Sequence, residues 1–327
     1  MKAYSRIAHA VALSLAAAAA APALAQEKYP TRPVRYVLPY PPGGSTDPMA
    51  RFICAKLSEI WGESCVVDNR PGGNTVIGTQ VLVSATPDGY NIGWAGSSMF
   101  SGPSLLPSLP YDVTKDLTGI ATIAKQRVIL VVHPTVPAKS LKELIALAKA
   151  KPGALNFASS GHGTNTHLSG ELFKLDTGVN LTHIPYKGSG PATTDLLAGR
   201  VQMSFQIPIT VIPMIKQSKL RPIAITGDGR LEALPDVPTF AEAGLPGYGL
   251  TTVTGMVAPA KTPRKILEKI NDDIEKILRS PSTKETFDKQ GVEPYITTSP
   301  DDMTEVLKEQ IARYSKIIKS AGIKFQP

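Results

Sequence analysis

The chain has 327 residues and a formal net charge of +8, with 42% hydrophobic and 19% charged residues. After the N-terminus no stretch is apolar enough to span a membrane, so a membrane-embedded protein is not expected. Basic residues are scattered among acidic ones without a Lys/Arg run or interleaved aromatics, which argues against nucleic acid and leaves a mild preference for anionic ligands.

Residues 1–25 are typical of a Sec signal peptide. Lys2 and Arg6 precede an apolar run over 8–21, and Ala23-Leu24-Ala25 forms an A-x-A cleavage site before Gln26. The run is shorter than the roughly 20 apolar residues that a bilayer-spanning helix needs. We therefore expect cleavage, and a mature monomeric protein that is periplasmic and not itself membrane-embedded.

Three short strands with glycine turns are predicted near the start of the mature chain. The strands span 34–38, 65–68 and 91–95, and the turns 39–44, 69–73 and 96–98 follow them. After the first turn, Asp47 as N-cap and Pro48 in the first turn begin a helix that ends at Gly62. Trp61 lies on the apolar stripe of this helix and is expected in the core.

Cys54 in this helix and Cys65 in the next strand are the chain's two cysteines. An exported chain meets an oxidising compartment, so we predict a disulfide between them. A redox role is not expected, because no C-x-x-C spacing is present.

The same pattern returns in the second half of the chain. Strands are predicted at 128–132, 155–158 and 181–184, and the turns 159–166 and 185–190 lead into helices. Further strands are predicted at 220–226 and 251–257. Residues 263–321 are predicted as two or three amphipathic helices around a short strand at 292–297.

This alternation of strands and helices predicts an α/β protein with two lobes, each built on a mainly parallel sheet. Residues 26–126 and 251–327 are expected to form lobe 1, and residues 127–250 lobe 2. The chain is predicted to return from lobe 2 to lobe 1 somewhere between residues 221 and 256.

Gly/Ser/Thr-rich turns between strands and helices are the main functional signal. In open α/β sheets, ligands bind outside the carboxyl ends of the strands. Helix N-termini present free N–H groups and the positive end of the helix dipole, and glycine lets the backbone approach a ligand closely. Gly43-Gly44, Gly72-Gly73 and the 161–164 turn are therefore candidate anion-binding turns, although any one glycine could simply permit a tight turn.

Catalytic and metal sites are not indicated by the sequence. It contains no nucleophile elbow, phosphate-binding loop or H-E-x-x-H motif. Ser159 and Ser160 have no orienting acid visible in the sequence. His162 and His167 are wrongly spaced for two ligands on one helical face, so no metal is expected and His162 is assigned to a pocket wall. The prediction is a protein without catalytic residues, cofactor or metal.

Six motifs follow one another along the chain: Pro41-Pro42-Gly43-Gly44-x-x-Asp47, Asn69-Arg70-Pro71-Gly72-Gly73, Ser159-Ser160-Gly161-x-Gly163-Thr164-x-x-His167-Leu168, Pro185-Tyr186-Lys187-Gly188, Asp195-Leu196-Leu197-Ala198-Gly199 and Leu234-Pro235-Asp236-Val237-Pro238-Thr239-Phe240. Together they resemble the Bug proteins, the TctC family of extracytoplasmic receptors of tripartite tricarboxylate transporters. The resemblance covers essentially the whole mature chain. It implies a type II periplasmic binding fold, with two lobes joined by hinge strands that close on a ligand.

The resemblance also implies which residues bind the ligand. A carboxylate would be held chiefly by backbone amides and ordered water, with little contribution from Arg70 or Lys187. The implied contacts of the first lobe are Tyr40, Pro42, Gly43, Gly44, Ser97 and Ser98, and those of the second are Ser159, Ser160, Gly161, Thr164, Asn165 and Tyr186. Gln206, Met99 and Asp195 are placed in the outer pocket that sets specificity.

The predicted function is capture of a small carboxylate, either a dicarboxylate or an aromatic acid, for delivery to inner-membrane transporter subunits. A ligand-sensing component that docks on a receptor kinase would use the same fold and is the alternative. A secreted hydrolase is a third class, disfavoured by the missing nucleophile motifs.

Overall fold

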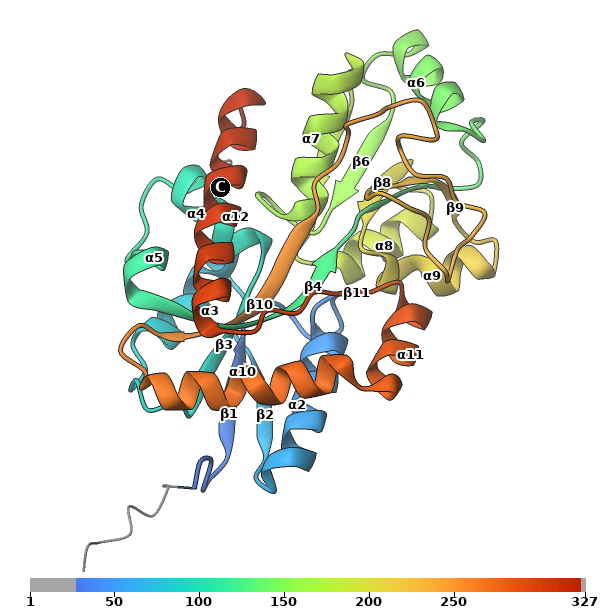
Figure 1. Cartoon of the computed structure of the whole chain (residues 1–327). Helices are drawn as coiled ribbons and strands as arrows, with labels where there is room; N and C mark the ends of the chain where they lie inside the picture. Colours follow the sequence, from blue (N-terminus) through green and yellow to red (C-terminus); the bar gives the residue numbers. More distant parts are fainter. Residues whose placement is uncertain (1–27, 325–327) are drawn as a thin grey trace, which may run out of the picture. The chain divides into compact units, whose positions relative to one another are not determined.

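The computed structural model describes residues 28–324 (Figure 1). The predicted signal peptide lies outside the described residues. Residues from Arg32 onward form one compact unit, and all elements below belong to it. Within the described part of the chain, no helix combines the length and the apolar character that crossing a membrane requires.

The described strands form two sheets. In spatial order, the first sheet contains β11 (Glu293–Pro294), β4 (Leu117–Gln126), β10 (Thr252–Pro259), β3 (Asn91–Ala95), β1 (Val34–Leu38) and β2 (Cys65–Asn69). The second contains β7 (Thr182–Pro185), β6 (Asn156–Ser159), β8 (Met203–Gln206), β5 (Ile129–Val132) and β9 (Arg221–Ile225).

Most strands of each sheet run in one direction. In the first sheet β1 pairs in parallel with β2 and β3, whereas β10 runs antiparallel to both β3 and β4. In the second sheet β6 is parallel to β7 and β8, and β5 runs antiparallel to β8 and β9. The strands that run against the rest are β10 and β11 in the first sheet and β5 in the second, and β5 and β10 are the strands at which the chain enters a sheet from the other one.

The helices are α2 (Asp47–Trp61), α3 (Val76–Val83), α4 (Ser97–Leu105), α5 (Val113–Asp116), α6 (Leu141–Ala150), α7 (Asn165–Thr177), α8 (Ser189–Leu197), α9 (Pro208–Lys216), α10 (Arg264–Arg279), α11 (Pro281–Gln290) and α12 (Pro300–Ser320), with a 3-10 turn, η1 (Gly73–Thr75), before α3. The chain passes from β4 to β5 across residues 127–128 and returns between β9 and β10. The lobe boundaries themselves stay a prediction.

Two sequence predictions about these elements are wrong in detail. The N-cap of α2 is Thr46, and Asp47 is the first helical residue, because its carboxylate turns back to bind the preceding turn. The predicted strand over 292–297 is reduced to Glu293–Pro294. Pro294 has no N–H to donate, and the backbone contact beyond it is a single bond from Tyr295 N to Ile123 O.

The first sheet is covered by helices from both ends of the chain. One cluster joins α3, α4 and α12, and in it Phe100 packs edge-on against Tyr314 with ring centroids 5.8 Å apart. Elsewhere Trp61 is buried, as predicted, and its Nε1 donates to Asp273 Oδ2 of α10 at 2.8 Å. Burial of each such side chain stabilises the fold by about 1.5–3 kcal/mol.

Alternate residues of β5 face different helices. Leu130 and Val132 belong to a cluster with α6 and α7, whereas Ile129 and Val131 belong to one with α8 and α9. Because successive side chains of a strand point to opposite faces, helices cover both faces of the second sheet. The turns that connect strands and helices therefore lie at the ends of its strands.

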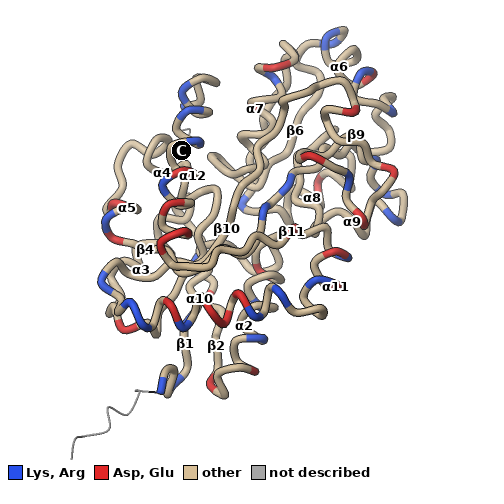
Figure 2. Tube along the Cα trace, viewed as in Figure 1, with Lys and Arg blue, Asp and Glu red and all other residues tan. Residues whose placement is uncertain are grey.

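Charged residues of both signs are interspersed on the outer helices, as Figure 2 shows along α10. Three ion pairs on this helix join residues four apart: Lys269 with the buried Asp273, and the exposed pairs Arg264 with Glu268 at 2.8 Å and Arg279 with Glu275 at 2.7 Å. Such exposed pairs stabilise a helix by only a few tenths of a kcal/mol.

Candidate ligand-binding site

A cavity of about 760 Å³ lies among turns contributed by both sheets. This volume is in the range of small-molecule sites, roughly 300–1,000 Å³. Its lining residues come mainly from the turn after β1, the segment leading into η1, the start of α4 and the turns after β6 and β7. The cavity therefore occupies the carboxyl ends of strands, where α/β sheets bind ligands.

Most of the predicted binding residues line this cavity. They are Tyr40, Gly44, Ser97, Ser98, Ser160, Gly161, Thr164, Asn165 and Tyr186. His162, assigned to a pocket wall, also lines it. The glycine turn at Gly72-Gly73 contributes to the lining as well.

The other predicted residues lie outside the lining. Pro42 and Gly43 are exposed, because the 39–44 turn presents its tip to solvent. Ser159 is buried and bonds His183 Nε2 at 2.6 Å, and Gln206 Nε2 donates to Ser204 Oγ at 2.8 Å within the second sheet. Met99 packs in the core around α4.

Six helices begin at the cavity wall, and the N-cap residues of α2, α3 and α9 in its lining are Thr46, Thr75 and Ile207. The N-cap residues of α4, α7 and α8 are Gly96, Thr164 and Gly188, and all three line the cavity. Each helix start supplies N–H groups without an intrahelical acceptor and the positive end of a dipole. A small anion is the ligand that this arrangement stabilises.

The charges around the cavity agree with an anionic ligand. Among residues 28–324 no Asp or Glu lines the cavity, and Lys187, which is exposed, is the one Lys or Arg that does. Arg70 lies outside the lining and pairs with Asp68 at 3.0 Å. A buried ammonium group would find no carboxylate partner here, so the cavity disfavours cations and amino acids.

Tyr186 and Tyr40 are hydroxyl donors held at the wall. The Tyr186 hydroxyl donates to Asp195 Oδ2 at 2.8 Å, and Asp195 is outside the lining, paired with Arg200 at 2.7 Å. Partial burial, together with this hydrogen bond, raises the pKa of Tyr186 to about 12. Burial also raises the pKa of Tyr40, against the opposing effect of hydrogen bonds with Ser98 and Ser97. Both phenols therefore stay protonated at neutral pH.

Asp47 ties together two of the turns that form the wall. Its carboxylate accepts from Gly43 N at 3.1 Å, Asn69 Nδ2 at 3.0 Å and Arg51 Nε at 3.0 Å. Burial alone would raise the pKa of Asp47, but the bonds from Arg51, Asn69 and the Gly43 N–H outweigh it and hold the pKa below its usual value. Asp47 thus acts as a positioning residue for the turns after β1 and β2.

Close contacts join the turns of the two sheets beside the cavity. Ser45 N donates to Ser189 Oγ at 3.1 Å. A Cβ at Gly188 would lie 3.0 Å from Pro41 Cγ, and one at Gly163 would lie 2.5 Å from Ser101 Oγ. Both glycines have positive φ, +110° and +70°. The turns of the two sheets can therefore lie this close because Gly188 and Gly163 have no side chains.

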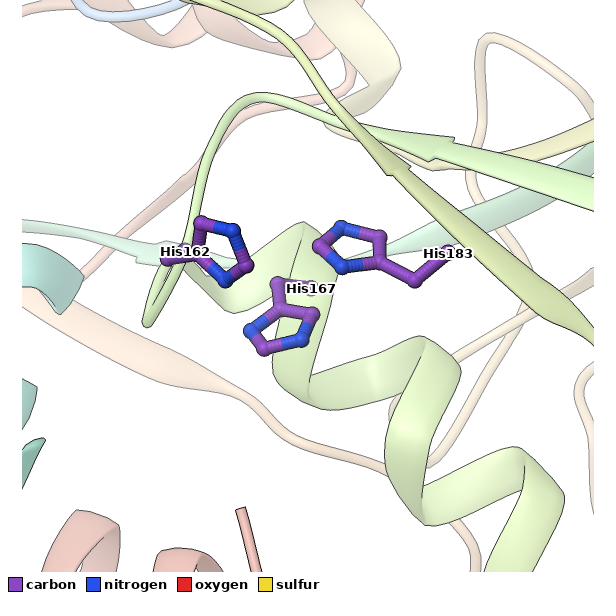
Figure 3. A group of neighbouring side chains, drawn as sticks. All are labelled: His162, His167 and His183. Atoms are coloured by element: carbon purple, nitrogen blue, oxygen red, sulfur yellow. The ribbon is translucent and has the colours of Figure 1, made fainter. Parts of the chain in front are cut away.

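Three histidines gather behind the 159–164 turn (Figure 3): His162, His167 and His183, each with one ring nitrogen within 4.8 Å of the others'. His167 and His183 are stacked with centroids 4.1 Å apart. His167 Nδ1 accepts from Gly163 N at 3.1 Å, which places the proton of the neutral ring on Nε2. His167 then has no free lone pair for a metal, and His183 Nε2 bonds Ser159 Oγ, so the cluster as arranged does not fit a metal centre.

Burial keeps these imidazoles neutral. It lowers the pKa of His167 to about 2 and that of His183 to about 3, with smaller contributions from the neighbouring cationic groups. Their role in this geometry is to support the backbone of the turn that carries Ser160 and Gly161.

Several lining residues were not predicted from the sequence. They include Asn74, Thr75, Trp94, Gln126 and Ile207. Trp94 and Gln126 lie in strands, where the apolar pattern indicates burial but not which side chain reaches a cavity. Asn74 and Thr75 follow a recognised glycine turn, and their left-handed backbone leaves no mark in the sequence.

Two α/β sheets, with a cavity at their strand ends to which no described Asp or Glu contributes, are the arrangement found in two-lobed ligand receptors. The family described as Tripartite tricarboxylate transporter family receptor, TctC, matches residues 49–323, and the chain belongs to this family. The predicted fold class and the Bug/TctC resemblance are thereby confirmed. The family is one of receptors and not of enzymes.

Individual relatives agree over almost the whole chain. Protein BugT of Bordetella pertussis (strain Tohama I / ATCC BAA-589 / NCTC 13251) is 37% identical over 324 residues, 98% of this chain and 99% of BugT. The structure of R. palustris Rpa4515 with adipate is 36% identical, with a TM-score of 0.87 over 90% of this chain and 99% of that one. MatC (Rpa3494) from Rhodopseudomonas palustris with bound malate is 28% identical, with a TM-score of 0.82 over 89% of this chain and 100% of that one.

Proposed function

We propose that this protein is exported to the periplasm, captures a small carboxylate in the cavity between its two lobes and delivers it to the membrane subunits of a tripartite transporter. The two lobes of the proposal are residues 26–126 with 251–327 and residues 127–250. The links from β4 to β5 and from β9 to β10 would act as the hinge.

The observation that carries the proposal is the chemistry of the cavity wall. Six helix starts lie at a lining whose described residues include no carboxylate side chain. A carboxylate satisfies such N–H groups, whereas a cation or an apolar ligand leaves them unpaired. Adipate and malate in two relatives support a carboxylate for this chain too.

In this proposal backbone amides and hydroxyls bind the carboxylate, and a side-chain cation does not. The N–H groups of Ser160, Gly161, Gly163 and Thr164 already donate within the turn. The second lobe therefore contributes the N–H groups of His162 and Asn165 with the side chains of Thr164 and Asn165, and the first lobe contributes Ser97 and Ser98. Tyr40 donates a phenolic hydrogen bond, whereas the one O–H of Tyr186 is donated to Asp195, so that Tyr186 lines the cavity with its ring and hydroxyl oxygen.

A thermal-shift screen of carboxylic acids on the mature protein tests binding. A ligand at 100 times its Kd stabilises the folded state by about 2.7 kcal/mol, which raises the melting temperature measurably. We expect mono- or dicarboxylates to raise it and the matching α-amino acids not to. A melting temperature unchanged by every carboxylate, or raised only by amino acids, contradicts the proposed function.

Delivery requires a separate experiment. Cells that lack this gene should take up the labelled ligand more slowly, and expression of the full chain should restore uptake. Normal uptake without the gene, together with loss of a transcriptional response to the ligand, would favour the sensing role instead.

A further inference from the structure

The chain passes from the first sheet to the second within two residues. Gln126 still pairs with Thr252 in the first sheet, whereas Val128 is buried in the hydrophobic cluster of the second sheet that includes residues of α6 and α7. Gln126 also lines the cavity, and its carbonyl oxygen accepts from Asn165 Nδ2 at 3.4 Å. Arg127 therefore lies next to a cavity residue, at the point where the chain leaves the first sheet.

The return link changes sheets in the same abrupt way. Tyr248 packs in the cluster of the second sheet, whereas Leu250 packs in the cluster that joins α3, α4 and α12. Gly249 lies between them with φ +146°, a backbone conformation that residues with side chains rarely adopt. A Cβ at Gly249 would lie 3.2 Å from Thr226 Cβ. Gly249 is therefore the position at which the return link can rotate while the side chains on either side stay packed.

Arg127 ties the two links to each other. Its Nε donates to Thr226 O and its Nη2 to Gly229 O, both just after β9. Backbone groups join the same segments, since Val128 N donates to Thr226 Oγ1 and Thr226 N to Val128 O, both at 2.9 Å. Gly227 has φ +102°, and a Cβ there would lie 2.6 Å from Arg127 Nε, so the guanidinium packs against backbone that has no side chain.

The charge of Arg127 is buried without an ion pair. The residue is 6% exposed. Within residues 28–324 no carboxylate pairs with it, and the exposed Asp228 and Glu293 act on its charge only from a distance. Burying a charge costs free energy unless hydrogen bonds compensate for the lost water. Here the compensating carbonyl groups belong to the other link, so what this side chain contributes is the connection between the links.

We propose that Arg127 and Gly249 are the two pivots about which the proposed lobes move, and that the bonds from Arg127 to Thr226 and Gly229, the Arg127 clamp, restrict this movement to one axis. The axis runs past Thr226, because the clamp and the close approach of Gly249 both involve that residue. What the clamp does for ligand affinity rests on the proposed function. Only one relative orientation of the lobes lets both hold the ligand, so removing other orientations raises the fraction of protein that can bind.

Attraction of the bound anion is the other role that a buried arginine beside a cavity can have. Arg127→Lys separates the two roles, because lysine keeps the charge but its compact ammonium group does not reproduce the fixed donor geometry of a guanidinium. Arg127→Met removes the charge and the donors together. With adipate and malate, the ligands of two relatives, as probes in calorimetry, we expect both variants to bind about tenfold more weakly than wild type.

Spin labels measure the freedom of the lobes directly. Lys142→Cys on α6 and Lys265→Cys on α10 place one label at an exposed position of each proposed lobe, with the native disulfide intact. Pulsed electron paramagnetic resonance on the mature protein then gives the distribution of distances between the labels. Without ligand, this distribution should be wider in Arg127→Lys and Arg127→Met than with the native arginine. Gly227→Ala should widen it too, since the added Cβ displaces the guanidinium without changing a charge.

Two controls match these changes in kind. Arg221→Met removes a guanidinium that donates to two carbonyl groups of residues 136–138 beside the second sheet, and it should lower the melting temperature without widening the distribution. Gly249→Ala should shift the mean distance, because the added Cβ meets Thr226. Gly247→Ala should leave the mean distance unchanged, since Gly247 also has positive φ, +78°, but a Cβ there would meet nothing within 4 Å. Equal distances in these two glycine variants would show that Gly249 is not a pivot.

The outcomes keep this inference separate from the proposed function. Distributions that stay as narrow as in wild type in Arg127→Lys, Arg127→Met and Gly227→Ala would show that no clamp exists. A distribution and an affinity that are unchanged in Arg127→Lys but altered in Arg127→Met would show that Arg127 acts through its charge. If no carboxylate binds to the wild type, the proposed function fails, and the ligand-free distributions still decide whether Arg127 and Gly249 are the pivots.

Discussion

Glycine at position 161 is the residue on which the proposed carboxylate site depends most. Its φ is +128°, and an added Cβ would lie 3.2 Å from Tyr186 O, inside the turn that would face the ligand. Gly43 was likewise predicted to belong to an anion-binding turn, but it is exposed, and a Cβ there would meet nothing within 4 Å. The sequence identifies both as turn glycines, but only the packing separates a wall residue from a solvent-exposed one.

We expect Gly161→Val to weaken carboxylate binding by at least about 100-fold, because the side chain displaces backbone donors from the ligand. Lys187→Ala and Arg70→Ala should each cost only about 1 kcal/mol or less, as for exposed charges. Calorimetry measures the affinities, and circular dichroism verifies that each variant is folded. Loss of binding in Lys187→Ala with intact binding in Gly161→Val would show that a side-chain cation holds the ligand.

The buried histidines make stability depend on pH. The pKa values of His167 and His183 fall to about 2 and about 3 in the folded protein, against about 6.5 in the unfolded chain. Between these folded-state pKa values and about pH 6.5, the unfolded chain therefore binds more protons than the folded protein. The contribution of the two neutral histidines to the free energy of unfolding is fully present above about pH 6.5 and declines as the pH falls below it. Each histidine contributes a slope of up to about 1.4 kcal/mol per pH unit.

Urea unfolding at pH 7.5, 6.0 and 5.0 measures this dependence. The free energy of unfolding should fall toward pH 5.0, and the slope should be smaller in His183→Gln, which removes one of the two groups. A free energy that stays constant from pH 7.5 to 5.0 would mean that the histidines are not buried in neutral form.

At the level of elements, local signals predicted most strands, whereas β4 and β8 were missed. Short apolar runs correctly indicated β1, β2, β3 and β6, and also β5, β7, β9 and β10. β4, whose sequence LTGIATIAKQ includes Gly119, was not predicted, because its length follows from pairing with β10 and not from its own propensity. Trp94 and Gln126 were not predicted as cavity residues, because tertiary packing and not local sequence determines which side chains of a strand reach the cavity.

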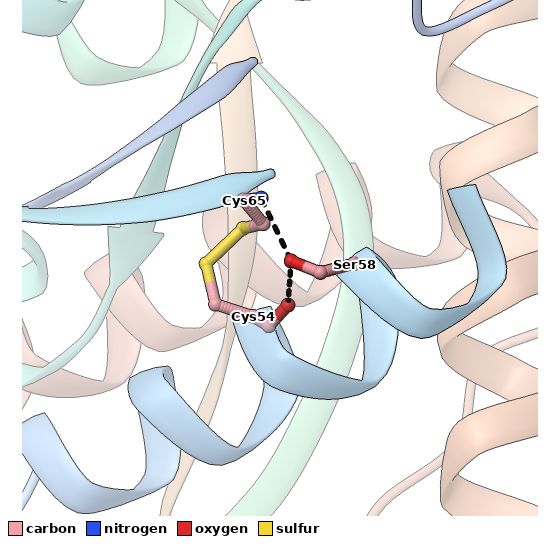
Figure 4. The surroundings of a disulfide bond; sticks show 3 residues. All are labelled: Cys54, Ser58 and Cys65. Carbon is pink, nitrogen blue, oxygen red and sulfur yellow. Dashed lines mark hydrogen bonds between the residues drawn. A yellow bond between two sulfur atoms is a disulfide. The ribbon is translucent and has the colours of Figure 1, made fainter. Parts of the chain in front are cut away.

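The disulfide is an element-scale feature that the sequence did indicate. It joins Cys54 of α2 to Cys65 at the start of β2 across a Cα–Cα distance of 5.0 Å (Figure 4). Ser58 adds two hydrogen bonds between α2 and β2, because its Oγ donates to Cys54 O and accepts from Cys65 N, both at 2.8 Å. The bridge thus fixes the angle between the first helix and the edge strand.

Removing the bridge should destabilise the protein without changing ligand affinity. Closing a loop of this length is worth roughly 3 kcal/mol in the chain-entropy account. The Cys54→Ala/Cys65→Ala double variant should therefore unfold at lower urea concentration than the wild type and bind the same carboxylate with unchanged Kd. An unchanged urea midpoint would show that the bridge contributes nothing to stability.

At the scale of the whole molecule, binding between two lobes requires them to approach. The contacts of Pro41 with Gly188 and of Ser45 with Ser189 join turns of different sheets and depend on a glycine without a side chain. Contacts divided between two lobes are all made only when the lobes are close, so a ligand that uses both stabilises the closed state.

Small-angle scattering detects this closure. The radius of gyration of the wild type should fall when a saturating carboxylate is added, and Gly188→Val should show a smaller fall and weaker binding. An unchanged radius in the saturated wild type would argue that the ligand occupies one lobe alone.

The central claim is that backbone and hydroxyl groups of both lobes hold a carboxylate in the cavity. A crystal structure of the protein with the tightest-binding acid from the screen tests it most directly. The account predicts carboxylate oxygens within hydrogen-bonding distance of the 160–165 turn on one side and of Ser97 or Ser98 on the other. A carboxylate paired with Lys187 or Arg70, or bound outside this cavity, would contradict it.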